Sequence, residues 1–209
     1  MKTNKYSFKT ETRDTKRLFI ALPLPYAVRQ HLKERASQCK RQWPFKKWVH
    51  VEDYHLTLKF LGDTTLTRLP RLNRSLAEIA SCFSPFKLSL ENLGVFGDPS
   101  RPRILWIGVQ GELDVLNNLQ HKVEEEMAKL GYPADNRPYR PHVTLARTYR
   151  GKQTFDIRSL NQGVQLNSDK ITWQVKEVVL YESRADLLPM YKPQLIVQLG
   201  HKFGNYYSQ

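Results

Sequence analysis

The sequence has few cysteines, no long apolar run and no glycine-rich phosphate loop, and each shortage excludes a class of protein. Cys39 and Cys82 are too few and too scattered for a disulfide framework or a cysteine metal site, which suits a reduced, cytoplasmic setting. No apolar run approaches the roughly 18 residues of a membrane span. The polar start has no apolar stretch behind it, so we expect neither a secretory signal nor membrane association. Without a glycine-rich loop, ATP-dependent nucleotidyl transfer is not supported.

Acidic residues are also scarce. The chain has 20 Asp and Glu against 33 Lys and Arg, a formal net charge of +13 at pH 7. Solubility needs only a modest charge of either sign, so this excess favours a polyanionic partner, of which nucleic acid is the commonest. Charge alone leaves an RNA-binding module and an enzyme acting on phosphorylated substrates equally open.

With 209 residues and a hydrophobic content of 40%, the chain can bury a core in one large domain or two small lobes, and its patterned part covers residues 17–199. Residues 1–16 are polar and basic without periodicity and are predicted to form a flexible arm, and residues 200–209 a tail. Strands are predicted over residues 17–22, 54–61, 86–96, 104–109, 171–181 and 194–199, and helices over about 25–40, 66–80 and 112–130. Each half thus holds strands and a helix, which suggests an internal duplication.

Residues 43–49 interleave aromatic side chains with Lys46 and Lys47. Such a mixture suits stacking on nucleobases together with attraction of phosphates. The aromatic residues could equally pack in the core just before the next strand. Both interpretations stay open at the level of sequence.

Two short motifs carry the functional interpretation: His55-Leu56-Thr57-Leu58 and, 87 positions later, His142-Val143-Thr144-Leu145. For this composition, random order predicts about 0.04 His-x-Thr-Leu matches, and the chain has two. Along a strand, residues i and i+2 share a face, so each motif places a histidine and a threonine on one face with apolar residues behind. We expect the two strands to meet, so that these four polar side chains surround one phosphate.

The chemistry of phosphodiester cleavage needs this set of groups. A base must activate water and an acid must protonate the departing alkoxide, and histidine can do either near neutrality. Threonine hydroxyls can donate to the phosphoryl oxygens. We therefore predict that His55 and His142 are catalytic and that Thr57 and Thr144 bind phosphate, with no metal and no cofactor. The acidic run 124–126 is interpreted as a solvated helix face, because no His or Cys lies at ligand spacing.

A single copy of the motif would be explained better by a buried structural histidine. Two copies, in a chain of this charge, favour a catalytic site. The motifs and their surroundings resemble the two-histidine (2H) phosphoesterases, and in particular the RNA 2′,3′-cyclic phosphodiesterase branch, also called 2′–5′ RNA ligases. The resemblance runs over about residues 17–199 and is carried by residues 17–21, 55–62, 101–106, 141–147 and 180–183.

This resemblance implies an α+β fold with two lobes, in which two antiparallel β-sheets form a central cleft, the helices lie outside, and a pseudo-twofold axis relates the halves. The implied reaction opens a 2′,3′-cyclic phosphate at an RNA end and leaves a 2′-phosphate, without a metal. Weak reverse 2′–5′ joining would accompany it, and the implied setting is RNA repair or tRNA processing.

By the same resemblance, His55 protonates the departing O3′ and His142 activates the water, although the spacing fits the swapped roles equally well. Phe60 and Arg147, each five residues after its histidine, contact the terminal nucleobase or the RNA. A regular strand would place them on the opposite face, so a bend or strand end is required. Gly62 offers one in the first motif, and nothing signals one in the second. The alternatives are core packing for Phe60 and a solvated charge for Arg147.

The expected partner is RNA with a 2′,3′-cyclic phosphate end, and we expect a cytoplasmic monomer. Hydrolysis of small cyclic nucleotides is an alternative within the same fold, but a mononucleotide does not need so large a positive charge. A non-catalytic RNA-end-binding protein is the alternative of a different class. Both intact His-x-Thr pairs argue against it, because binding alone could use Lys and Arg.

Overall fold

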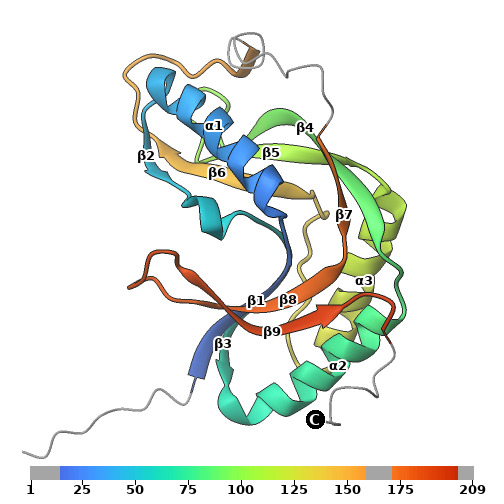
Figure 1. Ribbon diagram of the computed structural model, residues 1–209. Coiled ribbons are helices and arrows are strands. Elements are labelled where there is room, and N and C mark those ends of the chain that lie inside the picture. Colours follow the sequence, from blue (N-terminus) through green and yellow to red (C-terminus); the bar gives the residue numbers. More distant parts are fainter. Residues whose placement is uncertain (1–14, 159–170, 202–209) are drawn as a thin grey trace, which may run out of the picture.

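The computed structural model describes residues 15–158 and 171–201 (Figure 1). The predicted arm before residue 15 and the predicted tail after residue 201 lie outside this range. Thr15 and Lys16 open strand β1 (Thr15–Pro23), where they pair with Thr65 and Thr64. They were predicted to belong to the arm, because the exposed end of a strand has no apolar alternation to mark it.

The first lobe is a four-stranded antiparallel sheet in the order β3-β1-β8-β9. Helices α2 and α3 pack against it and against each other (Figure 1). The predicted helices 66–80 and 112–130 are thereby confirmed. The bounds of these elements are β3 (His55–Thr65), β8 (Glu177–Ser183), β9 (Tyr191–Gln198), α2 (Leu69–Ser81) and α3 (Leu113–Lys129).

The second lobe is a five-stranded antiparallel sheet in the order β2-β6-β5-β4-β7. The predicted pairing of residues 86–96 with residues 104–109 is confirmed in β4 and β5. Helix α1 lies against this sheet and buries one apolar face (Figure 1). The bounds are α1 (Tyr26–Gln42), β2 (Phe45–Trp48), β4 (Phe86–Phe96), β5 (Ile104–Gly111), β6 (His142–Tyr149) and β7 (Thr172–Val175).

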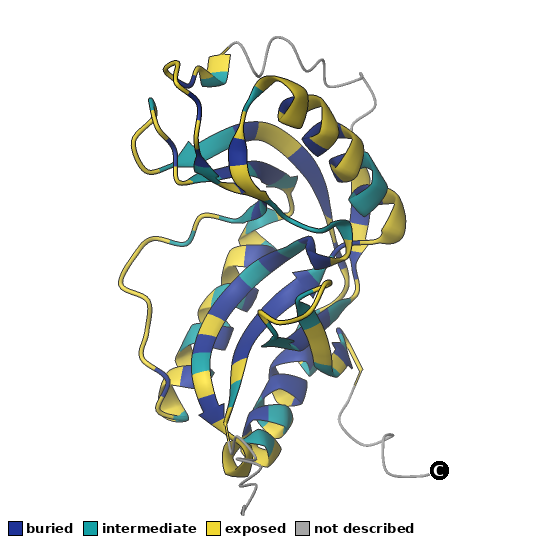
Figure 2. Cartoon of the chain, turned by 90° about the vertical axis from the view of Figure 1, so that its left-hand side faces the viewer, coloured by how far each residue is buried: buried dark blue, intermediate teal, exposed yellow. Residues whose placement is uncertain are grey.

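One continuous apolar core joins the two lobes. Buried residues alternate with half-buried ones at the starts of β3 and β6, whereas β1 is buried without a break over residues 18–22 in the middle of its sheet (Figure 2). Leu56, Leu58, Val143 and Leu145, the apolar residues of the two motifs, are all buried, as the alternation predicts. The α+β fold with two lobes and two antiparallel sheets is thus as expected. Within the described residues, no helix has the length and hydropathy needed to cross a membrane.

The single strand predicted over residues 171–181 is wrong in one respect. The chain forms two strands there, β7 in the five-stranded sheet and β8 in the four-stranded sheet, with Lys176 between them. Both strands carry buried apolar residues, so the run looks continuous in sequence. Only the packing of the lobes decides that the chain changes sheets at this point.

The aromatic residues of the stretch 43–49 belong to the core. Phe45 is buried, Trp43 packs on Phe155 with a centroid distance of 4.7 Å, and Trp48 packs on Phe45 at 5.8 Å. The two lysines between them are exposed. Base stacking by these aromatic residues is therefore not supported, whereas the lysines remain available to a ligand.

Candidate active site

His55 is the first residue of β3, and its ring is held at both nitrogens. Nδ1 lies 2.8 Å from the carbonyl oxygen of Asp53, and Nε2 lies 3.0 Å from Oγ1 of Thr57. A carbonyl can only accept, so the network assigns the proton to Nδ1. In the neutral ring Nε2 is then an acceptor, and the shared face of His55 and Thr57 predicted from their spacing is confirmed by this contact.

His142 repeats the arrangement at the start of β6. Its Nδ1 lies 2.7 Å from the carbonyl oxygen of Arg140, again two residues earlier in the chain. The same tautomer follows, with Nε2 left as the acceptor of the neutral ring. Strands β3 and β6 come from different lobes and contact each other. The two histidines therefore present equivalent nitrogens from two sides.

A β-bulge in each motif strand brings the residue five positions after the histidine, Phe60 or Arg147, back to the face of that histidine. In the pairing of β1 with β3, Ala21 lies opposite Thr57 and Ile20 opposite Lys59, so Leu58 is an extra residue. Leu58 and Lys59 are consecutively buried, and Phe60 is 68% exposed. A β-bulge shifts the alternation by one residue. Phe60 therefore returns to the face of His55, and core packing of its ring is excluded.

The second motif has the same bulge at the same place. In the pairing of β5 with β6, Trp106 lies opposite Thr144 and Leu105 opposite Ala146, which leaves Leu145 as the extra residue. Arg147 is consequently exposed on the face of Thr144. No bend was apparent here from the sequence. The matching bulges also support the duplication suggested by the two motifs.

Aromatic rings fix the imidazole planes. The ring centroid of His55 lies 4.9 Å from that of Phe19 and 5.0 Å from that of Tyr191. The ring centroid of His142 lies 4.9 Å from that of Phe96 and 6.0 Å from that of Trp106. Sequence reasoning did not assign these aromatic neighbours a role, because they come from strands far away in the chain.

Burial lowers the pKa of both histidines. For His55 the pKa is lowered to about 4, mainly by desolvation, and the hydrogen bond to the Asp53 carbonyl opposes this. The charges of Arg147 and His142 lower it further. For His142 desolvation is again the largest cause, opposed by the Arg140 carbonyl and reinforced by Arg147. Arg147 thus lowers the pKa of both histidines, and the strands that carry the histidines, β3 and β6, contact each other.

These shifts predict that acid lowers the free energy of unfolding. In the unfolded chain His55 takes up a proton as the pH falls below about 6.5. In the folded protein it takes up this proton only as the pH falls below its lowered pKa of about 4, so between these values protonation favours the unfolded chain. The stabilisation is therefore complete above about pH 6.5 and is lost as the pH falls through this window. Urea denaturation across the window should show the decline in the wild type and a smaller decline in His55→Gln. Equal slopes for the two proteins would contradict the lowered pKa of His55.

Asp53 is a buried positioning residue that the sequence did not reveal. Its carbonyl accepts from His55, and its carboxylate accepts from the backbone N–H groups of Met190 at 2.9 Å and Tyr191 at 3.1 Å. The residue as a whole is 3% exposed. Such charge-assisted bonds are stronger than neutral ones. Asp53 thereby ties the start of β9, including the ring of Tyr191 that packs on His55, to the first motif.

We expect Asp53→Ala to lower kcat/KM for phosphodiester cleavage by about tenfold or more. The substitution would let the His55 ring shift, and small displacements of a catalytic group cost large factors in rate. Asp53→Asn should lose much less, since the amide oxygen can still accept from both backbone N–H groups. Steady-state kinetics with thermal melts would measure this. Glu52→Ala is the matched control, because the neighbouring Glu52 pairs with Arg29 at 3.0 Å instead. Equal losses for Ala and Asn at position 53 would refute a positioning role.

The loop before His142 is anchored to the strand of His55. Tyr139 Oη donates to the carbonyl of Thr57 at 3.1 Å, and Lys59 Nζ donates to the carbonyl of Pro133 at 2.9 Å. Because residues 131–141 lead directly into β6, these bonds fix the approach of the second motif to the first. They connect the two lobes through polar contacts as well as through the core.

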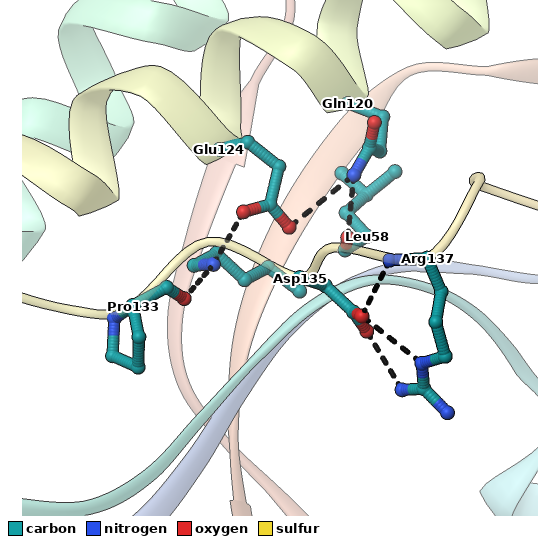
Figure 3. A network of polar contacts seen from close by, with 7 residues as sticks. Leu58, Gln120, Glu124, Pro133, Asp135 and Arg137 are labelled. Carbon is teal, nitrogen blue, oxygen red and sulfur yellow. Dashed lines mark hydrogen bonds and ion pairs between the residues drawn. The ribbon is translucent and has the colours of Figure 1, made fainter.

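Lys59 is buried and joins α3 to this loop through Glu124 and Pro133, both labelled in Figure 3. Its ammonium forms an ion pair with Glu124 of α3, and Gln120 donates to Glu124 at 3.3 Å. The prediction that residues 124–126 form a solvated face is therefore wrong for Glu124. The bulge turns Lys59 inward, under α3, and this inversion is invisible in the sequence pattern.

Among the residues that the structure describes, no group of three or more His, Cys, Asp or Glu side chains is arranged to hold a metal ion. The candidate site consists of the imidazoles of His55 and His142, the hydroxyls of Thr57 and Thr144, the exposed ring of Phe60 and the guanidinium of Arg147. These groups can provide an acid, a base, hydrogen-bond donors to an anion and a surface for a nucleobase.

Comparison with known sequences agrees with this geometry. A family profile described as the 2′-5′ RNA ligase superfamily matches residues 25–187. An RNA 2′,3′-cyclic phosphodiesterase of Geobacillus stearothermophilus is 37% identical over 174 residues, which cover 83% of this chain and 54% of that protein. One of Bacillus subtilis (strain 168) is 32% identical over 182 residues, covering 87% of this chain and 96% of that protein. The chain thus spans about half of the first relative and nearly all of the second.

Solved structures share the architecture. TT0787 of Thermus thermophilus matches with a TM-score of 0.72 at 24% identity, covering 90% of this chain and 100% of that chain. E. coli LigT, solved in complex with 3′-AMP, matches with a TM-score of 0.70 at 23% identity, covering 90% and 99%. At this level of identity the likeness establishes the fold, α+β with two lobes.

Proposed function

The chain belongs to the 2′-5′ RNA ligase superfamily, and on this premise we propose that it is a metal-independent RNA 2′,3′-cyclic phosphodiesterase. It opens the cyclic phosphate at an RNA end and leaves a 2′-phosphate. The sequence relatives named RNA 2′,3′-cyclic phosphodiesterase support this reaction. The observation that carries the proposal is the equivalent placement of the two imidazoles: Nδ1 of each is bonded to the carbonyl two residues earlier, which leaves Nε2 for proton transfer, and in His55 this Nε2 meets the Thr57 hydroxyl.

In the proposed step, one histidine takes a proton from water as the water oxygen bonds to phosphorus. The P–O3′ bond breaks, and the other histidine gives its proton to O3′. We assign the acid to His55 and the base to His142, following the family resemblance. The hydroxyls of Thr57 and Thr144 donate to the phosphoryl oxygens, where negative charge develops. The bound phosphate favours the protonated form of the acid, which offsets the lowered pKa of His55 in the free enzyme.

We assign RNA contacts to Phe60 and Arg147. The exposed Phe60 ring lies 5.9 Å from the buried ring of Phe19, which itself stacks on Tyr181 at 5.3 Å, so aromatic packing supports Phe60 from behind while its exposed face suits a nucleobase. Arg147 lies near both histidines and supplies positive charge. The net charge of +13 favours RNA over a free mononucleotide. We further propose a cytoplasmic monomer that acts in RNA repair or tRNA processing.

The reaction is tested with a short oligoribonucleotide ending in a 2′,3′-cyclic phosphate, incubated in EDTA, with separation of the 2′- and 3′-phosphate products. Conversion to the 2′-phosphate alone is expected. Loss of activity in EDTA would overturn metal independence, and a 3′-phosphate product would overturn the assigned leaving group. The same enzyme accelerates both directions of one equilibrium, so weak 2′–5′ joining of suitable ends should accompany hydrolysis.

Two alternatives have distinct outcomes in this assay. A non-catalytic RNA-end-binding protein would bind the oligonucleotide with a steep dependence on salt but give no product. A hydrolase of small cyclic nucleotides would turn over a nucleoside 2′,3′-cyclic phosphate better than the oligonucleotide.

A further inference from the structure

Tyr191, the first residue of β9, and Met190 before it connect the two lobes at the candidate site. Met190 Sδ accepts a hydrogen bond from Lys47 Nζ at 3.0 Å, and Lys47 is the cross-strand partner of Arg147 in the five-stranded sheet. Tyr191 reaches Arg147 itself, because its hydroxyl accepts a hydrogen bond from the guanidinium. Two consecutive residues of one lobe thus contact both members of one strand pair in the other lobe.

The ring of Tyr191 also contacts the first catalytic group. It lies edge-on against the imidazole of His55, with a centroid distance of 5.0 Å and an angle of 87° between the two planes. It meets the ring of Phe19 in a similar way at 4.8 Å. The backbone N–H of Tyr191 donates to the carboxylate of Asp53 at 3.1 Å, in the segment that leads into β3 (Figure 1). Tyr191 is therefore held on the side of His55 while its hydroxyl extends to the other lobe.

The electrostatics agree with this contact. Burial raises the pKa of Tyr191, and the positive charge of Arg147 and its hydrogen bond oppose the rise. The hydroxyl therefore stays protonated near neutrality and is an acceptor without charge. A guanidinium has five N–H donors. Arg147 can thus keep its contact with Tyr191 and still present its charge, its plane and further donors to a ligand.

We propose that Tyr191 is a positioning residue that couples the contact of Arg147 with the nucleobase to the placement of His55. This inference rests on the proposed function and adds a residue to it. A long arginine side chain must be ordered when a ligand binds, and the Tyr191 hydroxyl orders the guanidinium beforehand. The ring has a separate task, since it packs on the catalytic imidazole. Loss of the hydroxyl and loss of the ring should therefore have different kinetic effects.

The test measures hydrolysis of adenosine 2′,3′-cyclic phosphate by the full chain. Tyr191→Phe removes only the hydroxyl, so KM should rise by about three- to tenfold, the cost of ordering one long side chain, while kcat changes by less than about twofold. Tyr191→Leu also removes the ring beside His55, so kcat should fall by about tenfold or more. Tyr26→Phe is the matched control, because this tyrosine at the start of α1 is 67% exposed, and loss of its hydroxyl should change neither constant.

A second comparison shows whether Tyr191 acts through Arg147. In an Arg147→Ala background, Tyr191→Phe should raise KM by less than about twofold, because the partner of the hydroxyl is already absent. An equal rise in both backgrounds would overturn the coupling. So would a fall in kcat in Tyr191→Phe as large as that in Tyr191→Leu. Thermal melts of all variants check that β9 remains folded.

Affinity for adenosine 2′-phosphate, the product of the proposed reaction, gives the same comparison without turnover. In titration calorimetry Tyr191→Phe should weaken binding by about three- to tenfold, and the effect should disappear in the Arg147→Ala background. Equal affinities of wild type and Tyr191→Phe would overturn the coupling while hydrolysis stands. A wild type that binds this nucleotide but opens no cyclic phosphate would overturn the proposed function, and the effect of Tyr191→Phe on binding would still decide the coupling.

Discussion

Replacement of either His55 or His142 by alanine is expected to lower turnover by about 10²-fold or more, because each removes a general acid or base. Both rings lie between aromatic neighbours at the start of a strand, with apolar residues behind them in the core. The fold should therefore survive. Product formation from a cyclic-phosphate oligonucleotide, together with the far-UV spectrum and thermal melt of each variant, measures the effect.

His121→Ala is the control for this experiment. His121 lies on the exposed surface of α3, and its side chain is 74% exposed, so its loss should change turnover by less than about twofold. The double variant at His55 and His142 should lose far less than the product of the single losses, because groups of one catalytic unit are not additive. Near-wild-type turnover in either single variant would refute the two-histidine mechanism. Thr57→Ala and Thr144→Ala should each cost less than a histidine.

The same variants can separate the acid from the base. A phosphodiester with a nitrophenolate leaving group does not need protonation of that group. The variant that lacks the general acid should therefore regain turnover on this substrate relative to the cyclic phosphate, whereas the variant that lacks the base should not. Regain by His55→Ala supports the assignment proposed above, and regain by His142→Ala reverses it.

The second large effect concerns stability. Glu124→Ala should lower the free energy of unfolding by about 3–5 kcal/mol, because it leaves the Lys59 ammonium buried without its carboxylate partner. The side chain of Lys59 is 2% exposed, so it has little access to water. For a chain of this size the loss corresponds to a fall in Tm of roughly 6–20 °C. Urea denaturation and calorimetry would measure it.

Two comparisons make this prediction specific. Glu125→Ala removes the adjacent carboxylate, which is 48% exposed, and should change stability by less than about 0.5 kcal/mol. Lys59→Met with Glu124→Leu replaces both charges by apolar groups and should lose much less than Glu124→Ala alone. If Glu124→Ala stays within about 1 kcal/mol of wild type, the ion pair does not stabilise the junction between β3 and α3.

The sequence by itself determined the two motifs and the faces of their strands. Strict alternation places His55 with Thr57, and His142 with Thr144, in front of buried leucine and valine, and this local geometry needs no distant contact. The same holds for the buried faces of α1, α2 and α3, which follow from helical spacing. Hydrophobic periodicity encodes which side of an element is buried, and this information lies within a few neighbouring residues.

Only the tertiary structure decided how the site is completed. The bulges that return Phe60 and Arg147 to the catalytic face depend on the pairing of β3 with β1 and of β6 with β5. Asp53 positions the start of β9 through a hydrogen bond from the backbone of Met190, 137 positions later. Glu124 neutralises the buried Lys59, which lies 65 positions earlier. Residues 171–181 divide between two sheets for a similar reason. Register and partner choice are set by packing energy between distant segments, and such energy leaves no periodic mark in the chain.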